Sequence, residues 1–283
     1  MKKQQLLLVG GGFLLLIILF FFVPTTPKKS AGVDPGQMHT HSNDSVAIDF
    51  PQILAAAKQS LQPQQVEHLV RLENSVGRGD VNEQTLHAYH QLARYWGDSL
   101  KVFLPFAYYT AQAAKLENSE KNLTFAANLY LANLQVQKNS QLKNWMAREA
   151  SELFEKALIL NPDNDSLKVG LGSCYIFGNL SSNPMEGIMR IREVAERDPE
   201  NTYAQFMLGV GGVISGQFDR AAERFIRVIN KEPENLEAIL RLAEVYELTN
   251  KNDSAVIWYR KSQELISNPD FKMAVEERIK SLK

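Results

Sequence analysis

The sequence has one cysteine, Cys174, so no intrachain disulfide can form and no cysteine near the N-terminus could carry a lipid. Neither charge sign is in excess, since 31 basic residues oppose 32 acidic ones and the formal net charge is −1. That balance excludes the basic surface expected of a nucleic-acid-binding protein. A lone cysteine suits either side of a membrane, and we expect Cys174 to be packed rather than reactive.

The chain also lacks any arrangement of side chains typical of catalysis or metal binding. No Ser/His/Asp set and no pair of carboxylates stands out. Of the five histidines, His39 and His41 lie with Asp44 in a segment without apolar periodicity, which does not supply the four ligands of a structural zinc site. His87 and His90 could share a helix face, but no thiol or carboxylate completes a cluster. We therefore predict that the protein is not an enzyme and has no metal or cofactor.

The one long hydrophobic run lies at the N-terminus, from Leu6 to Val23, between two pairs of lysines. Its length reaches the lower bound for crossing a hydrocarbon core of roughly 30 Å. A cleaved signal peptide and a buried soluble helix are alternatives. The first would need small residues after the run, and the second would need a polar face. Neither is present, so we predict an uncleaved transmembrane anchor.

Orientation rests on the short basic tail before the anchor, because basic residues flank both ends. Keeping that tail cytoplasmic places the rest of the chain outside, which in a bacterium is the periplasm. We predict a single-pass protein of the cell inner membrane. The segment after the anchor is rich in Pro, Thr, Ser, Gly, Asp and His, and this composition is typical of a flexible tether.

A 34-residue period is the main feature of the remaining chain. Residues 202–235 and 236–269 repeat the same layout, so that Leu208 matches Leu242 and Phe225 matches Tyr259. Gly209, Ala221, Ala243 and Ala255 are small residues at the positions where two packed helices would cross. Such a period predicts a stack of helix–turn–helix units. The glycines from Gly209 to Gly216 fall inside this pattern and not in the strand–turn–helix context of a nucleotide-binding loop, so no nucleotide is expected.

This pattern resembles the tetratricopeptide repeat (TPR) family, specifically over residues 165–269. The fold class it implies is all-α, a solenoid of helical hairpins with a C-terminal capping helix, preceded here by one transmembrane helix. The helix that starts near Trp145 is expected to be the second helix of its unit. The first helix of that unit is expected within 123–137, and a polar connection at 138–143 is expected between the two. The predicted division is a cytoplasmic tail at 1–5, an anchor at 6–23, a flexible linker at 24–50, N-terminal helices with a degenerate repeat at 51–122, repeats at 123–269 (best units 165–201, 202–235 and 236–269) and a capping helix at 270–283.

In the family that this chain resembles, the first helices of the repeats line a concave groove. Carried over position by position, the resemblance implies a groove with an apolar, aromatic middle and one acidic end. Arg241 stands beside Glu237 and Glu244, so the basic clamp with which some family members hold a C-terminal carboxylate is not expected. The predicted partner-binding residues are Val169, Ser173, Ile176, Phe177, Tyr203, Phe206, Val210, Val213, Leu240, Glu244 and Glu247.

These features predict a membrane-tethered scaffold that binds protein or peptide partners through a concave groove, with no nucleic acid or nucleotide among them. A chaperone-like module for secreted or envelope proteins is the alternative, because an apolar groove without a charged clamp would suit unfolded clients. A structural or self-associating domain is a third possibility. The sequence names neither the partner nor the pathway.

Overall fold

The computed structural model describes residues 48–77, 82–178, 180 and 185–282. Over these residues the chain is all-α, with thirteen α-helices and a π-helical turn at Tyr95–Ser99. The helices are α2 (Phe50–Lys58), α3 (Pro63–Gly77), α4 (Asn82–Arg94), α5 (Phe103–Glu117), α6 (Glu120–Leu134), α7 (Ser140–Leu160), α8 (Asp165–Gly178), α9 (Met185–Arg197), α10 (Thr202–Ile214), α11 (Phe218–Lys231), α12 (Leu236–Leu248), α13 (Asn252–Leu265) and α14 (Pro269–Ser281).

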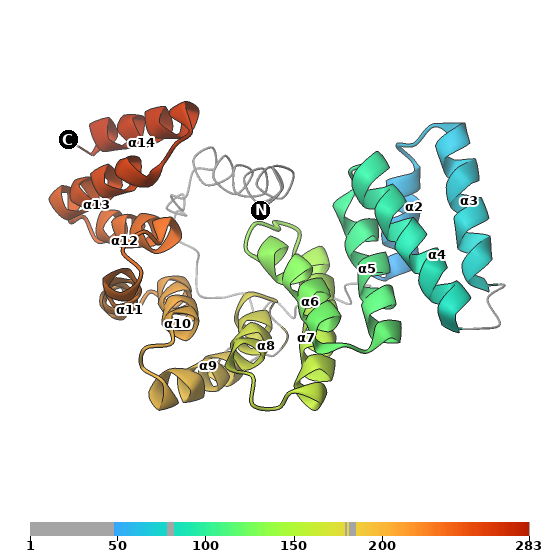
Figure 1. Cartoon of the computed structure of the whole chain (residues 1–283). Helices are drawn as coiled ribbons and strands as arrows, with labels where there is room; N and C mark the ends of the chain where they lie inside the picture. Colours follow the sequence, from blue (N-terminus) through green and yellow to red (C-terminus); the bar gives the residue numbers. More distant parts are fainter. Residues whose placement is uncertain (1–47, 78–81, 179, 181–184, 283) are drawn as a thin grey trace, which may run out of the picture.

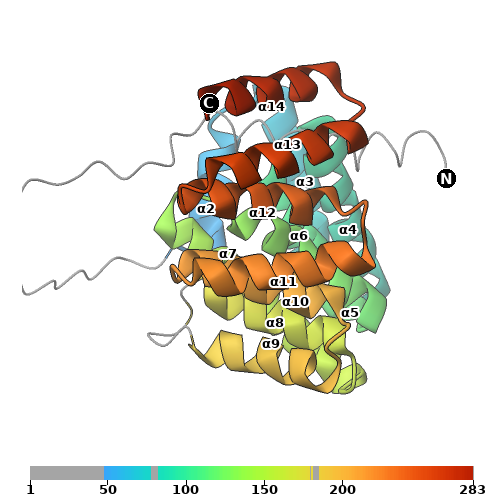
Figure 2. The ribbon, with the colours of Figure 1, turned by 90° about the vertical axis from the view of Figure 1, so that its left-hand side faces the viewer.

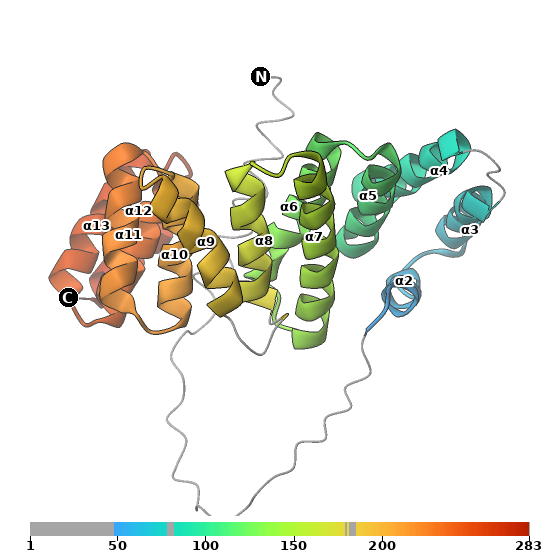
Figure 3. The same ribbon diagram turned by 90° about the horizontal axis from the view of Figure 1, so that it is seen from below.

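Successive helices pack as antiparallel hairpins in a curved row that runs from α2–α5 at one end to α13–α14 at the other (Figure 1). Viewed from the C-terminal end, α11, α12, α13 and α14 lie as stacked layers (Figure 2). Seen from below, the row continues without a break through α6–α9 (Figure 3). The predicted all-α array of helical hairpins is therefore confirmed.

The 34-residue period corresponds to repeated local geometry. Asn201 caps the start of α10 and Asn235 that of α12, and each side chain accepts a hydrogen bond from a backbone N–H in the first turn of its helix (2.9 and 3.0 Å). The hairpin turns contain Gly216 and Asn250, again 34 apart, both with a left-handed backbone (φ 72° and 57°). Glycine and asparagine adopt this conformation most easily, so both hairpins turn at the same place.

Three apolar clusters stabilise the row. The largest extends from α5 to α12 and includes Ile53 of α2, a second joins α12 to α14, and a third joins α3, α4 and α5 around the buried Trp96. Phe50, at the start of α2, stacks on Tyr108 of α5 with ring centroids 3.3 Å apart. This contact holds α2 against α5, although the α3–α4 hairpin separates these two helices in the sequence.

Two boundaries differ from expectation around the α6–α7 hairpin. The polar connection predicted at 138–143 is shorter, because the Asn139 side chain accepts hydrogen bonds from the backbone N–H groups of Gln141 and Leu142 and starts α7 at Ser140. The first helix expected within 123–137 begins at Glu120, after the Ser119 cap.

No helix among the described residues combines the length and apolarity needed to cross a bilayer. The predicted tail at 1–5, the anchor at 6–23 and nearly all of the linker at 24–50 lie outside the described residues, so they stay predictions.

Candidate functional site

A groove of about 840 Å³ lies on the inner side of the curved row, between α6, α10 and α12. Its floor is one face of α10, where apolar residues recur at helical spacing. Half of this floor is buried, whereas Tyr203 and Val213 are partly accessible and Ile214 is 61% exposed. The floor residues of α10 are Tyr203, Phe206, Met207, Val210, Val213 and Ile214.

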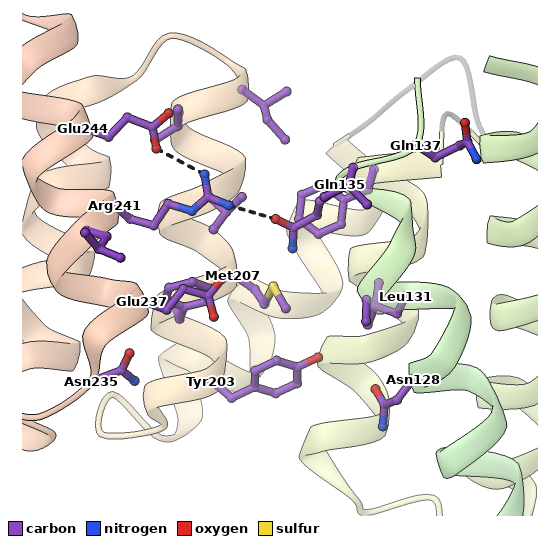
Figure 4. A pocket seen from close by; sticks show the side chains of 18 of the residues that line it. Asn128, Leu131, Gln135, Gln137, Tyr203, Met207, Asn235, Glu237, Arg241 and Glu244 are labelled. Atoms are coloured by element: carbon purple, nitrogen blue, oxygen red, sulfur yellow. Dashed lines mark hydrogen bonds and ion pairs between the residues drawn. The ribbon is translucent and has the colours of Figure 1, made fainter. Parts of the chain in front are cut away.

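Two walls of different chemistry face each other across this floor (Figure 4). The α12 wall is largely charged and the α6 wall presents small, apolar and amide side chains. Lys138, in the α6–α7 connection, and Lys143 of α7 continue the second wall. The α12 wall consists of Glu237, Leu240, Arg241 and Glu244, and the α6 wall of Asn128, Leu131, Ala132 and Gln135, followed by Val136 and Gln137.

One hydrogen-bonded bridge joins the two walls. Arg241 Nη2 donates to Gln135 Oε1 at 3.2 Å, between positions 106 residues apart in the sequence. Arg241 Nη1 donates to Glu244 Oε2 at 3.1 Å. The guanidinium is thus held by its own helix and by the opposite wall (Figure 4). The bridge spans the groove and limits the room above the floor.

The groove shifts the titration of several groups that line it. Burial raises the pKa of Glu237, against the opposing effect of the Arg241 charge. Burial also raises the pKa of Tyr203, and Cys174 and Glu237 add to that rise. Burial lowers the pKa of Lys143. Hydrogen bonds from Thr202 and Asn235 lower the pKa of Glu232 at one end of the groove. Apart from the shift of Glu232, these shifts follow mainly from burial, which disfavours the charged form of each group.

The lining of the groove has the chemistry of a binding surface. No group of three or more potential metal ligands is found in the described part of the chain. Cys174 is fully buried, and burial raises the pKa of its thiol, so it packs in the core.

His90 Nε2 lies 2.9 Å from Glu117 Oε1, a carboxylate that the sequence did not place near it. An apolar floor between polar walls is the usual form of a ligand groove.

The predicted groove residues divide into two groups in the structure. Seven line the groove: Phe177, Tyr203, Phe206, Val210, Val213, Leu240 and Glu244. Four do not: Val169, Ser173, Ile176 and Glu247. For every one of the eleven, the role in partner binding stays a prediction.

The four misplaced residues have clear alternative positions. Val169, Ser173 and Ile176 on α8 are buried because that helix packs against α6, α7, α9 and α10, and the Ser173 hydroxyl donates to the Val169 carbonyl at 2.8 Å. Glu247 faces the C-terminal helices instead, where it accepts hydrogen bonds from Arg278 Nε and the Tyr259 hydroxyl, both at 3.0 Å. It fastens α14 to the array and has no access to the groove.

The whole α6 wall was missed, because the sequence gave only approximate bounds for that helix. Once α6 is known to begin at Glu120, helical spacing places 128, 131, 132 and 135 on one face. The same spacing adds Met207 and Ile214 to the α10 face and Glu237 and Arg241 to the α12 face. No local pattern identifies Phe271 of α14, which reaches the groove through the tertiary fold.

Comparison with known proteins supports the repeat assignment for one part of the chain. Residues 213–275 match the tetratricopeptide repeat family model. No curated protein matches the sequence. The match covers less than half of the chain, and it spans the end of α10, the helices α11 to α13 and part of α14.

Solved structures resemble the chain only distantly. YrrB, described as a TPR protein with an unusual peptide-binding site, is 18% identical over 67% of this chain and 91% of its own, with a TM-score of 0.41. A MamA crystal structure is 18% identical over 65% and 92%, with a TM-score of 0.41. Residues 41-end of MamA from Desulfovibrio magneticus RS-1 are 17% identical over 64% and 94%, with a TM-score of 0.43. Likeness at this level carries no conclusion about function.

Proposed function

We propose that this protein is a scaffold that holds a protein partner by binding a peptide segment of it in the groove between α6, α10 and α12. The observation that carries the proposal is the accessible apolar floor of that groove. Tyr203, Val213 and Ile214 present apolar surface to solvent there, although Phe206, Met207 and Val210 on the same face are buried. Apolar surface left open in a concavity marks an interaction site more often than it marks a defect of packing.

The size and walls of the groove support a peptide as the ligand. A volume of about 840 Å³ falls within the range of roughly 300–1,000 Å³ that small-ligand sites occupy, and it holds a few side chains. The amides of Asn128, Gln135 and Gln137 line the groove, whereas the amide of Asn235 caps α12 and donates to Glu232. Amides both donate and accept, so they can pair with the backbone of an extended peptide.

The bridge across the groove favours a defined segment over many unfolded clients. Arg241 and Gln135 close the space above part of the floor, so that a ligand must pass beside or beneath this pair. A chaperone-like groove would gain from being open along its length. A scaffold role with one partner therefore fits this geometry better than the chaperone alternative.

The test uses photo-crosslinking in intact cells. A benzophenone amino acid at position 214, on the exposed rim, should crosslink to one partner, whereas the same amino acid at position 223, on the outer helix α11, should not. Adding Tyr203→Ala to the position-214 variant should abolish the crosslink without changing the circular dichroism spectrum. Tyr203 is preferred to Phe206 for this purpose because the Phe206 ring packs 5.6 Å from that of Phe225, between centroids, and supports the fold.

Three results would count against the proposal. Crosslinking from position 223 but not from 214 would place the interaction on the outer surface. A crosslink that survives Tyr203→Ala would separate it from the groove. A ladder of many products from position 214 would favour the chaperone-like role.

The proposal includes a membrane tether. It rests on the apolar run from Leu6 to Val23 and its flanking lysines, and it places the repeats in the periplasm. Alkaline phosphatase fused after Lys283 should be active, and a fluorescent protein that matures only in the cytoplasm should stay dark. An inactive phosphatase together with a bright fluorescent protein would overturn the predicted orientation. A mature N-terminus beyond residue 23 would overturn the anchor.

A further inference from the structure

Glu237 is the unusual charge of the groove. It projects from α12 beside Arg241 and toward the α10 floor (Figure 4). Among the described residues no hydrogen bond or ion pair involves its carboxylate. Its side chain is open to the groove, yet protein surrounds it closely enough to raise its pKa by burial. A carboxylate on the wall of a concave site can pair with a cation that enters with a ligand.

The other charges nearby do not fill this role. Arg241 is hydrogen-bonded to Glu244 and Gln135, so its charge is already opposed by a carboxylate on its own helix. Glu232 is an acid as well, and Thr202 and Asn235 donate to it. Counted together, Glu232, Glu237 and Glu244 outnumber the one guanidinium on this side of the groove. The α12 side therefore carries net negative charge over an apolar floor.

The two lysines of the opposite wall are weaker determinants. Lys138 is exposed in the connection between α6 and α7, and the long side chain of Lys143 can turn toward water. Glu237 has a shorter side chain fixed on a helix, next to Tyr203 and Arg241. Of the charges that are not hydrogen-bonded, it is the one best placed to select a ligand.

The geometry points to a basic peptide as the occupant: Glu237 receives a lysine or arginine side chain of the partner segment, whose neighbouring apolar side chains lie on the α10 floor at Tyr203, Met207 and Val213. This inference rests on the proposed function and adds the chemistry of the partner. Charge complementarity across a partly desolvated interface sets specificity more than total affinity, so Glu237 determines which segments are accepted.

The experiment uses the full-length chain in detergent micelles and three synthetic nonapeptides with identical apolar flanks. They differ only in the central residue, which is lysine, norleucine or glutamate, and each has an N-terminal fluorophore for anisotropy measurements. The lysine peptide should bind the unchanged protein about tenfold more tightly than the norleucine peptide, a preference typical of one close charge pair. The glutamate peptide should bind most weakly.

Variants separate the charge from the fold. Glu237→Gln should remove the preference for lysine and leave the norleucine affinity unchanged, because the amide keeps the size of the side chain and loses the charge. Glu223→Gln is the matched control, since Glu223 is exposed on the outer helix α11, and it should change nothing. Tyr203→Ala should weaken binding of all three peptides.

The lysine preference should also depend on pH. It requires the carboxylate form of Glu237 and is lost as the pH falls through the raised pKa of that group, above the usual glutamate range. The peptide lysine stays protonated throughout. Arg241 and Glu244 on α12, Tyr203 on α10, Glu232 before α12, and Lys138 and Lys143 opposite also face this space. The Glu237→Gln variant removes only the contribution of Glu237 and should show no such loss.

The outcomes separate this inference from the function it rests on. If Tyr203→Ala abolishes binding while lysine and norleucine peptides bind equally, the groove binds peptides and the role of Glu237 is wrong. Tightest binding of the glutamate peptide would overturn the inference in favour of Lys138 and Lys143. A lysine preference that persists in Glu237→Gln would do the same. No binding of any peptide would overturn both proposals.

Discussion

The repeat packing makes opposite predictions for two glycines of the same helix. An ideal Cβ added at Gly209 of α10 would lie 2.6 Å from Phe225 Cε1 and 2.9 Å from Cζ. Phe225 is fully buried in α11, so its ring has no space into which to move. A Cβ added at Gly211, two residues further on, would meet only Ile176, at 3.6 and 4.0 Å, which is ordinary contact.

The magnitudes follow from two opposing effects. Replacing glycine by alanine in a helix interior stabilises the helix by about 1 kcal/mol, and this gain applies to both positions. Forcing an extra methyl group into a packed core costs about 1–3 kcal/mol, and this cost applies only to Gly209. The shared gain cancels in the comparison. Gly209→Ala should therefore be less stable than Gly211→Ala by about 1–3 kcal/mol.

Urea denaturation followed by circular dichroism measures this difference. Gly211→Ala should raise the midpoint above that of the unchanged protein, and Gly209→Ala should fall below Gly211→Ala with a similar slope. Adding Phe225→Leu should remove most of the penalty of Gly209→Ala, because the crowding ring atoms are gone, so the two substitutions should be strongly non-additive. Equal midpoints for the two alanine variants would refute the close approach of α10 and α11 at Gly209.

Three further measurements address other parts of the array. Ala221→Leu places a large side chain at a fully buried helix crossing and should cost about 1–3 kcal/mol, whereas Lys251→Ala on an exposed turn should change stability by less than about 0.5 kcal/mol; equal denaturation midpoints would contradict the repeat register. Arg278→Met removes the partner of Glu247 and should speed hydrogen exchange of α14 with little change elsewhere, so unchanged exchange in 269–281 would show that apolar packing alone holds the cap. Cys174 should not react with a thiol reagent in the folded protein and should react fully in urea, because it is buried and its pKa is raised; rapid reaction of the native protein would place it at the surface.

The repeats were predictable where each contact lies within one unit or between neighbours. Gly209 faces Phe225 inside one hairpin, and the cap at Asn201 and the turn at Gly216 recur 34 residues later as Asn235 and Asn250. Contacts of this kind are set by fixed sequence separations, so a pattern read along the chain contains them.

The N-terminal helices were harder to predict because their contacts skip over neighbours. Phe50 of α2 stacks on Tyr108 and lies 6.5 Å from Trp145, between ring centroids, although α3 and α4 come between in the sequence. No periodicity encodes such a contact. The sequence could therefore indicate that helices form within 51–122, but not which side of the array α2 would cover.

The candidate groove depends on the curvature of the array, and that explains which site residues the sequence missed. The first-helix face of α8 matches that of α10 in the repeat pattern, but α8 is enclosed by α6, α7, α9 and α10, so Val169 and Ile176 are buried. The same helix α6 then lies across from α10 and α12 and supplies Gln135, which reaches Arg241 over 106 residues of sequence. Small rotations at each hairpin add up to this closure, and none of them is visible in a single repeat. The sequence thus predicted the α10 floor of the groove, whereas the opposite wall follows only from the sum of all the turns between α6 and α12.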